Sequence, residues 1–462
     1  MFIQTQEPML LSLFVLVISL FISTVRSSYA PNITYARPPV SSIEQVYKYF
    51  YNSSNLLTFS PYPPNHLSVS FNDGESFEPI KSITRPTSNV QMDPFNRNRA
   101  FALGEDIHYI SDDKGENWRQ FIASFGNDVF MPSCIRGSMD NRPQISFNAA
   151  NPDYLLISKY GCLRKDHEWK CFYIYYYTTD GFKTVNRLPV DNTQICKFVK
   201  STPGFKLGNE SSILCVSKQC RSSRDTHLFK SDDFFKSKSE IKVDDSGIID
   251  DLRIENSFVV VLVKSSKYIF DPPVHLYTSK DAITFKKSNI EIENKYGEYR
   301  MNFLSSSSSL ILQIFPKHYD STSTIYYSDS SGVHFRKNLD HVSGEKIGNV
   351  EKFGGTWIAN IEMNPSGKAG DNAQGSNVGP KRIVTKYSFN SGREWSLLKS
   401  NDEDCDINSG CSIHLHKPFG DEKFTTESSL DILMGVGNKG DHLISDIRSE
   451  EMKTFISRDG GA

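Results

Sequence analysis

The sequence predicts an all-β protein, a large β-propeller of four-stranded blades, and three observations carry this prediction. A phrase of the form Ser-x-Asp-x-Gly-x-x-aromatic recurs along the chain, as in SDDKGENW at residues 111–118. Its copies start roughly 40 to 70 residues apart, and repeats of that order indicate propeller blades or solenoid units. Aromatic residues make up 12% of the chain, which favours strands. Helical periodicity is nearly absent after residue 60.

The recurring phrase has the chemistry of a β-hairpin turn. Asp or Asn at its third position can accept hydrogen bonds from backbone N–H groups two residues on. Gly at the fifth position adopts a positive φ without a Cβ penalty, and the closing aromatic residue starts the return strand. Since this role needs no ligand, we interpret the phrase, called here the Asp-box, as the turn of each blade. Its clear copies place structural residues at Ser70, Asn72, Gly74, Phe77, Ser111, Asp113, Gly115, Trp118, Ser328, Ser330, Gly332, Phe335, Ser388, Asn390, Gly392 and Trp395.

Weaker copies of the Asp-box fill the intervals between the clear ones. They read TTDGFKTV at 178–185, SDDFFKSK at 231–238 and SKDAITF at 279–285, and a clipped copy with Ser457, Asp459 and Gly461 ends the printed sequence. The stretch 364–381 is rich in Gly, Asn and Ser, so we expect it to form a loop inside one blade.

The N-terminal segment differs from the rest of the chain. Residues 9–25 are apolar, and Ser28 and Ala30 fit a small-x-small cleavage site, so we expect residues 1–30 to be a secretory signal peptide. An uncleaved signal anchor is the alternative, because residues 1–8 carry no Lys or Arg and the apolar run is nearly long enough to span a bilayer. Either way the remainder faces the lumen or the outside. A lead-in over residues 31–59 and a propeller over 60–462 are expected to follow.

The net charge and the cysteines further limit the classes of function that the sequence allows. A formal net charge of −2 gives no electrostatic footprint of a nucleic-acid-binding protein. An even number of cysteines in an exported chain favours disulfides, and the absence of paired C-x-x-C motifs disfavours zinc. The cysteines are Cys134, Cys162, Cys171, Cys196, Cys215, Cys220, Cys405 and Cys411. Asn-x-Ser/Thr sequons mark three expected glycosylation sites, Asn32, Asn52 and Asn209.

Four stretches carry a resemblance beyond the repeat itself. They are DPFNRNRAFAL (93–103), YYSDSSGVHF (326–335), CDINSGCSIHLH (405–416) and GVGNKGDHL (435–443) followed by TFISRDGG. From about residue 60 to the last residue, the chain resembles the luminal propeller domain of the sortilin and fungal vacuolar protein sorting receptor (carboxypeptidase Y receptor) family. YYSDSSGVHF has the variant of the Asp-box in which Ser330 replaces Asp.

The resemblance implies a ten-bladed propeller that captures peptide or protein cargo, such as vacuolar or lysosomal hydrolase precursors, in its channel. It implies transport from Golgi to endosome or vacuole, without catalysis or a cofactor. Cys405–Cys411 and Cys196–Cys215 look like disulfides of the family. Proximity makes Cys162–Cys171 a plausible pair, which leaves Cys134–Cys220. Animal sortilins hold a peptide carboxylate with an Arg where this chain has Ser257, so that contact is not expected.

The resemblance also implies that the printed sequence stops before the last blades. The family's cysteine-rich module, transmembrane helix and cytosolic tail are expected beyond Ala462 and do not occur in the sequence. The chain would then be a luminal or secreted binding domain, and membrane association would come only from an uncleaved N-terminal segment. A receptor fragment without independent function is an alternative.

Enzyme and metal sites are less favoured by the sequence. Sialidases also use the Asp-box, but they need an Arg-Ile-Pro-like motif before the first box, and RLP at 187–189 falls after the third. A sialidase-like glycoside hydrolase is therefore the weaker reading. His414 and His416 would lie on one strand face without a third ligand. The acidic run 402–406 reads as a solvated loop rather than a calcium site.

Overall fold

A computed structural model describes most of the chain after residue 45. The described residues are 46–59, 67–104, 107–122, 143–165, 168–190, 192–218, 226–244, 247–265, 273–292, 301–304, 308–315, 322–343, 348–349, 356–363, 382–390, 392–401, 403–416, 425–427, 432–445 and 450–457. They hold strands β1 to β32 and one 3-10 helix, η1 (Ile407–Ser409). The expected all-β class is therefore confirmed. Within these residues, no helix is long and apolar enough to cross a membrane.

The chain divides into two compact units, Met1–Thr84 and Arg85–Ala462. The first unit holds one antiparallel sheet in the order β1-β2-β3-β4. Its strands are β1 (Val46–Tyr49), β2 (Leu56–Phe59), β3 (Leu67–Ser70) and β4 (Glu78–Pro79). The boundary expected at residue 60 falls inside this sheet, because β1 and β2 pair over their whole length before it. We call each such group of four strands a blade and number the blades in chain order.

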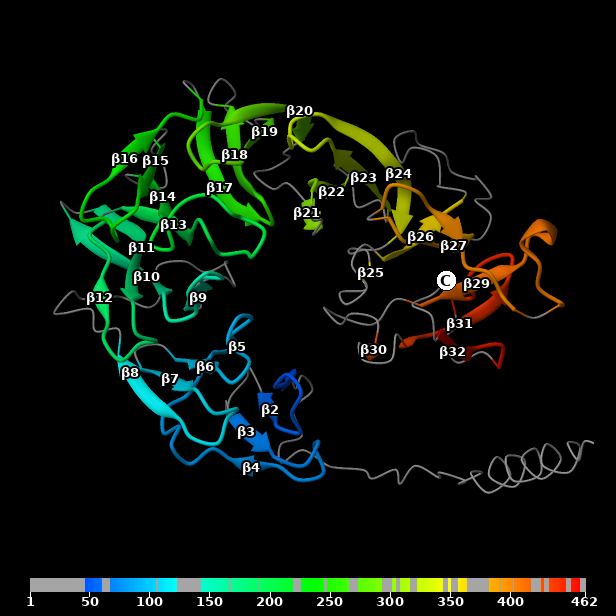
Figure 1. Cartoon of the computed structure of the whole chain (residues 1–462), viewed down its shortest axis with the longest axis horizontal. Helices are drawn as coiled ribbons and strands as arrows, with labels where there is room; N and C mark the ends of the chain where they lie inside the picture. Colours follow the sequence, from blue (N-terminus) through cyan, green and yellow to red (C-terminus); the bar gives the residue numbers. More distant parts are fainter. Residues whose placement is uncertain are drawn as a thin grey trace, which may run out of the picture. The chain divides into compact units, whose positions relative to one another are not determined.

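The second unit holds blades 2 to 8, which follow one another along the chain (Figure 1). Blades 2 to 4 comprise β5 (Asn89–Met92), β6 (Ala100–Leu103), β7 (Ile107–Ser111), β8 (Arg119–Ile122), β9 (Gln144–Phe147), β10 (Leu155–Lys165), β11 (Glu168–Thr178), β12 (Asn186–Arg187), β13 (Thr193–Phe198), β14 (Ile213–Lys218), β15 (Thr226–Ser231) and β16 (Ser239–Ile241). Blades 5 and 6 comprise β17 (Gly247–Glu255), β18 (Phe258–Ser265), β19 (Val274–Ser279), β20 (Lys286–Ile292), β21 (Met301–Leu304), β22 (Ile311–Ile314), β23 (Thr322–Ser328) and β24 (Phe335–Ser343). Blades 7 and 8 comprise β25 (Gly348–Asn349), β26 (Trp357–Glu362), β27 (Ile383–Ser388), β28 (Ser396–Leu397), β29 (Ser412–Leu415), β30 (Thr425–Glu427), β31 (Ile432–Gly440) and β32 (Lys453–Ser457).

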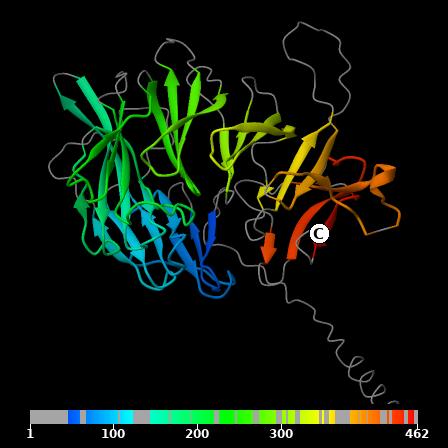
Figure 2. The same cartoon turned by 45° about the horizontal axis from the view of Figure 1, so that its top comes forward.

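Blades 1 to 7 are simple antiparallel meanders, and blade 8 is the exception. Single residue pairs join neighbouring blades at two places, Tyr173↔Thr193 between blades 3 and 4 and Val342↔Ile361 between blades 6 and 7. In blade 8, β29 and β30 both pair with β31, and β32 pairs with it as well. Figure 2 shows the blades of the second unit as separate, twisted sheets.

Consecutive blades of the second unit share hydrophobic cores, and β18 shows how. Its run Phe258–Val263 is 0 to 1% exposed, as expected for a strand covered on both faces. Phe258, Val260 and Leu262 join a core with blade 6, whereas Val259, Val261 and Val263 join a core with blade 4. Because side chains alternate across a strand, one apolar run packs against two neighbours. This shared packing is the arrangement of a propeller.

The Asp-box residues lie at the turns between the third and fourth strands of the blades. In blade 2, the Ser111 hydroxyl accepts a hydrogen bond from the Gly115 N–H at 2.8 Å and donates one to Asp113 at 2.8 Å. Asp113 also accepts from the Asn117 N–H at 2.9 Å. The same set of bonds forms around Ser70 and Asn72 in blade 1 and around Ser388 and Asn390 in blade 7. Gly115 has a φ of 88°, which glycine adopts without strain.

The blade 6 turn departs from this pattern. The second residue, Asp329, accepts hydrogen bonds from the N–H groups of Ser331, Val333 and His334. Ser330, expected to replace the Asp of the box, is exposed and makes none of these bonds. The Ser328 hydroxyl instead accepts from the Leu310 N–H at 2.8 Å. A carboxylate one position earlier thus closes the turn in place of the third residue.

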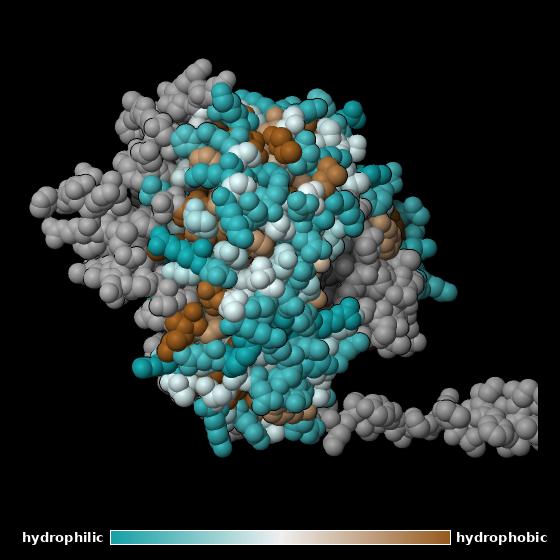
Figure 3. Space-filling model, turned by 60° about the vertical axis from the view of Figure 1, so that its left-hand side comes forward, coloured by the Kyte–Doolittle hydropathy of each residue, from teal (hydrophilic) through white to brown (hydrophobic). Residues whose placement is uncertain are grey.

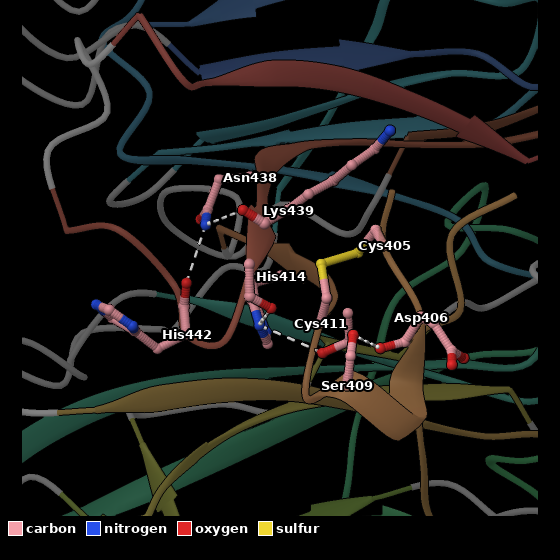
Figure 4. The surroundings of a disulfide bond; sticks show 10 residues. Cys405, Asp406, Ser409, Cys411, His414, Asn438, Lys439 and His442 are labelled. Atoms are coloured by element: carbon pink, nitrogen blue, oxygen red, sulfur yellow. Dashed lines mark hydrogen bonds between the residues drawn. A yellow bond between two sulfur atoms is a disulfide. The ribbon is translucent and has the colours of Figure 1, made fainter. Parts of the chain in front are cut away.

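Two disulfides lie in the described part of the chain. Cys196–Cys215 joins directly opposed residues of β13 and β14, and Cys405–Cys411 closes the loop that contains η1 before β29 (Figure 4). Cys162 and Cys171 are backbone partners in the β10–β11 register, but their side chains lie outside the description. Cys134 and Cys220 lie outside the described residues altogether.

Candidate functional site

A cavity of about 730 Å³ lies against the first strands of blades 3, 4 and 5. Its walls are β9, β13 and β17, with Phe95 from blade 2 at one side. These strands can be followed in Figure 1. The volume lies within the range of ligand-binding pockets. This is the candidate functional site of the described residues.

The sequence of β17 brings charges to the cavity and apolar residues to the core. Asp251, Arg253 and Glu255 alternate with Leu252 and Ile254. Leu252 and Ile254 are buried in the core between blades 4 and 5, and the three charged residues line the cavity. A strand period of two residues places all three charges on one face.

Two of these charges neutralise each other. The Arg253 Nε lies 2.6 Å from an oxygen of Asp251, and the guanidinium stacks over the Phe303 ring, 5.2 Å from its centroid. The Leu252 N–H also donates to Asp251. The Asp251–Arg253 pair is therefore held by its own blade and by blade 6.

Lys197 of β13 and Glu255 of β17 have no such pairing. Both line the cavity and are half-buried, and among the described residues neither makes a hydrogen bond or ion pair. Burial lowers the pKa of Lys197, and the nearby Asp251 carboxylate opposes this. Burial raises the pKa of Glu255 to about 7, while Arg253 opposes the shift. Removal from water penalises both charges.

Two buried polar atoms on neighbouring strands also lack partners. Within the described part of the chain, the Ser146 hydroxyl of β9 and the Gln194 side-chain oxygen of β13 are buried and accept or donate no hydrogen bond. The amide nitrogen of Gln194 does donate to the Asp250 carbonyl, at 3.4 Å. Leaving a buried polar group unsatisfied costs about 1–3 kcal/mol.

The histidines of the sequence analysis lie away from this cavity and do not form a metal site. His414 of β29 is buried, and its Nδ1 accepts from the Thr385 N–H at 3.1 Å while Nε2 lies 3.0 Å from the Gly440 carbonyl. Both ring nitrogens are thus engaged in hydrogen bonds between β29 and its neighbours. No group of three potential metal ligands occurs among the residues that the structure describes.

The other residues named from the sequence lie elsewhere. The Asp-box residues sit at the turns, Asn52 and Asn209 are exposed in loops, and Ser257 lies in the β17–β18 turn. Asn32, Asp459 and Gly461 lie outside the described residues. On the face shown in Figure 3 the described residues are mostly hydrophilic, with apolar residues in small separate patches.

Sequence reasoning missed the cavity residues Lys197 and Glu255. A usable pattern was present, because the alternation of charged and apolar residues in DDLRIE (250–255) is typical of a strand with one buried face. The period shows that the charges share a face. It does not show that β13 of the preceding blade brings Lys197 to the same cavity.

Comparison with known proteins places the chain in a family. The sortilin–Vps10 family, described as "Sortilin, neurotensin receptor 3", matches residues 65–462. Vacuolar protein sorting/targeting protein 10 of Candida albicans (strain WO-1) is 40% identical over 463 residues, covering 96% of this chain and 28% of the relative. The proteins of the same name from Candida dubliniensis and Debaryomyces hansenii are 39% and 36% identical over 96% of this chain.

The chain spans 28% to 29% of the length of these three relatives. Their shared name describes protein sorting and targeting, not an enzymatic activity. The family match covers most of the chain, and it agrees with the all-β blades and with the sequence resemblance. This protein belongs to the sortilin–Vps10 family.

Proposed function

We propose that this chain is a cargo-binding domain of a vacuolar sorting receptor, which holds peptide segments of hydrolase precursors without chemical change. The observation that carries the proposal is the cavity on β9, β13 and β17, where charged and polar groups lack partners. Binding sites leave such groups unpaired until the ligand arrives, at a cost in stability. The names of the relatives supply the class of function.

The proposed setting is the lumen of the Golgi and endosomes. Residues 1–30 act as the signal peptide or anchor, and Asn32, Asn52 and Asn209 carry glycans. The exposure of Asn52 and Asn209 in loops supports their modification. Cys162–Cys171 and Cys134–Cys220 are the proposed further disulfides, the first supported by the direct backbone pairing of its residues.

The proposed architecture is a ten-bladed ring in which the Asp-boxes fix the turns. The surface of blade 8 supports further blades. Phe455 of β32 packs toward blade 7, whereas Val436 and Ile456 are 41% and 57% exposed. Their positions in the β31–β32 register place them on the opposite face. Another blade that packs there would cover these side chains.

Binding of hydrolase propeptides tests the proposed function. The protein is secreted as residues 31–462, and its β-rich circular dichroism and monodispersity are established first. Synthetic propeptides of vacuolar hydrolases are then titrated in a fluorescence polarisation assay, with scrambled peptides as the control. We expect saturable binding of at least one propeptide. A well-folded sample that binds none of them would remove the proposal.

A further inference from the structure

Within the described residues, charged groups that make no hydrogen bond or ion pair converge at this cavity from two different blades. Lys197 comes from blade 4 and Glu255 from blade 5, and both reach the cavity that Ser146 and Gln194 also line. The chain brings these residues together from positions far apart in sequence. A second hollow, of about 650 Å³ near the turn of blade 6, is lined largely by exposed side chains such as Arg336, which water already solvates.

The charges of the cavity wall are not equivalent. Arg253 is committed to Asp251 and to the Phe303 ring, so it offers little to a ligand. Lys197 and Glu255 carry opposite charges without a hydrogen bond or ion pair in the described residues. No contact within 4.0 Å joins them as an ion pair, although the charge of each acts on the pKa of the other. The wall therefore presents one cation and one anion that are not in direct contact.

We propose that the cavity binds a peptide segment that carries one acidic and one basic side chain, the acidic side chain contacting Lys197 and the basic one contacting Glu255. This inference rests on the proposed function for the class of ligand and adds the charge pattern that selects it. A charged ligand group close to a desolvated opposite charge forms a stronger hydrogen bond than a neutral group. A segment that binds in the same chain direction with the opposite order of charges would place like charges together, which supplies selectivity.

Uncharged polar residues also line this wall. Ser146 and Gln194 contribute to it, and within the described residues the Ser146 hydroxyl and the Gln194 oxygen are buried without a hydrogen bond. Ile195 and Phe95 provide apolar surface beside them. Few convergent polar groups on a partly apolar wall are typical of specific pockets.

The test uses hexapeptides with blocked termini, so that no terminal charge contributes. On a Ser/Gly scaffold, Asp and Lys are placed with one, two or three residues between them, in both orders. Matched peptides replace Asp by Asn, Lys by Gln, or both. Affinities are measured by fluorescence polarisation with wild-type protein, Lys197→Met and Glu255→Gln. Lys183→Met and Glu116→Gln, at exposed positions of the Asp-box turns, are the matched controls.

We expect the best Asp/Lys peptide to bind wild-type protein at least tenfold more tightly than its Asn/Gln analogue. Lys197→Met should abolish the preference for Asp over Asn and keep the preference for Lys over Gln, and Glu255→Gln should do the reverse. The double variant Lys197→Glu/Glu255→Lys should prefer the opposite order of charges. The control variants should bind as wild type does.

The outcomes separate this inference from the proposed function. The inference would be overturned if wild-type protein showed no preference for charged peptides. It would also be overturned if the variants lowered the affinity for charged and neutral peptides equally. Propeptides that bind wild type and both variants alike would also overturn it, while leaving the proposed function in place. Binding of charged hexapeptides without any propeptide binding would support the inference and reject hydrolase precursors as cargo. As a folding control, each variant should show the circular dichroism spectrum and the melting temperature of wild-type protein.

Discussion

The Asp-box turns and the cavity wall differ in how far their polar side chains are hydrogen-bonded. At the turns of blades 1, 2 and 7, the Ser hydroxyl and the third-position Asp or Asn have partners at 2.8 to 3.0 Å, and the same bonds recur in all three blades. At the cavity, Lys197, Glu255, Ser146 and Gln194 leave charges or polar atoms unsatisfied, and each differs from its neighbours. The repeated polar contacts therefore build the blades, whereas the polar residues of the proposed site do not repeat from blade to blade.

The difference also appears in the pKa values of the carboxylates. The Asp233 carboxylate at the blade 4 turn accepts hydrogen bonds from the N–H and hydroxyl of Ser237 and from the Ser231 hydroxyl, and these lower its pKa to about 2. Burial without such donors raises the pKa of Glu255 to about 7. The turn stabilises its charge, whereas the cavity wall does not.

The largest expected loss of stability follows removal of a buried arginine on the turn side of blade 2. Arg99 contacts Asp112 and Asp153 at 2.7 Å each and donates to the Pro152 carbonyl at 2.7 Å. It also lies 3.6 Å from the fully buried Asp93. Arg99→Ala leaves that carboxylate without its cation, so we expect a loss of about 3 kcal/mol in the free energy of unfolding.

Urea unfolding followed by tryptophan fluorescence measures the effect of Arg99→Ala. Arg336→Ala is the control, because Arg336 is exposed and exposed substitutions stay within about 0.5 kcal/mol. Equal midpoints for Arg99→Ala and wild type would show that the contacts between blades 2 and 3 do not depend on this side chain.

Loss of one hydroxyl at a turn should have the next largest effect. In Ser111→Ala the buried Gly115 N–H loses its acceptor, and we expect a loss of about 2 kcal/mol. Ser330→Ala in blade 6 is the matched control. Ser330 occupies the third position of its box, where other boxes have Asp or Asn, but it is exposed and makes none of the turn bonds. A similar loss for both variants in urea unfolding would contradict the turn geometry described above.

Neutralising the cavity wall should stabilise the protein. Lys197→Met removes a half-buried ammonium without a direct partner, and we expect a gain of about 1 kcal/mol in the free energy of unfolding. Differential scanning calorimetry of Lys197→Met beside Lys183→Met, at an exposed turn position, measures it. A loss of more than about 1 kcal/mol for Lys197→Met alone would mean that Lys197 serves the fold and not a ligand.

Glu255 should give the cavity wall a pH dependence. Its folded-state pKa is raised to about 7 from an ordinary value of 4.5, so folding favours the protonated acid. The stabilisation that comes from protonated Glu255 is therefore fully present below pH 4.5 and is lost as the pH rises through 7. Thermal melts of wild type and Glu255→Gln from pH 4 to 8 should therefore diverge in this window, with wild type losing stability relative to the variant as pH rises. Parallel curves would contradict the burial of this carboxylate.

The fold could be predicted from the sequence to a greater extent than the site. Turn chemistry is local, so Ser111, Asp113 and Gly115 predict their own hydrogen bonds, and the spacing of boxes predicts the blades. The blade 6 turn shows the limit, because the local pattern assigns the third-position role to Ser330, whereas the folded backbone gives it to Asp329 at the second position. The spacing of the boxes does not locate the start of blade 1, because β1 and β2 precede the first box and carry no box of their own.

The site depends on which strands meet, and no local pattern encodes that. Lys197 follows Cys196, whose side chain packs into the core between blades 3 and 4, and the alternation of β13 sends Lys197 to the other face. Glu255 reaches the same cavity only because blade 5 packs on blade 4. The charges in DDLRIE mark one strand face, but their ligand-binding role depends on packing between blades.

The smallest expected effect concerns His414, and its sign is opposite to that of Glu255. Burial lowers the pKa of His414 below 6.5, although the Gly440 carbonyl opposes this. Protonation would place a proton on Nδ1, which faces the Thr385 N–H at 3.1 Å. The stabilising contribution of the neutral ring is therefore full above pH 6.5 and is lost as the pH falls below it. In thermal melts between pH 7.5 and 5, wild type should lose more stability than His414→Gln. The same melts of Glu255→Gln separate the titration of His414 from that of Glu255. If the His414→Gln curve parallels wild type, protonation of His414 does not destabilise the protein between pH 7.5 and 5, and the bond that joins β29 to β27 is not the acid-sensitive contact.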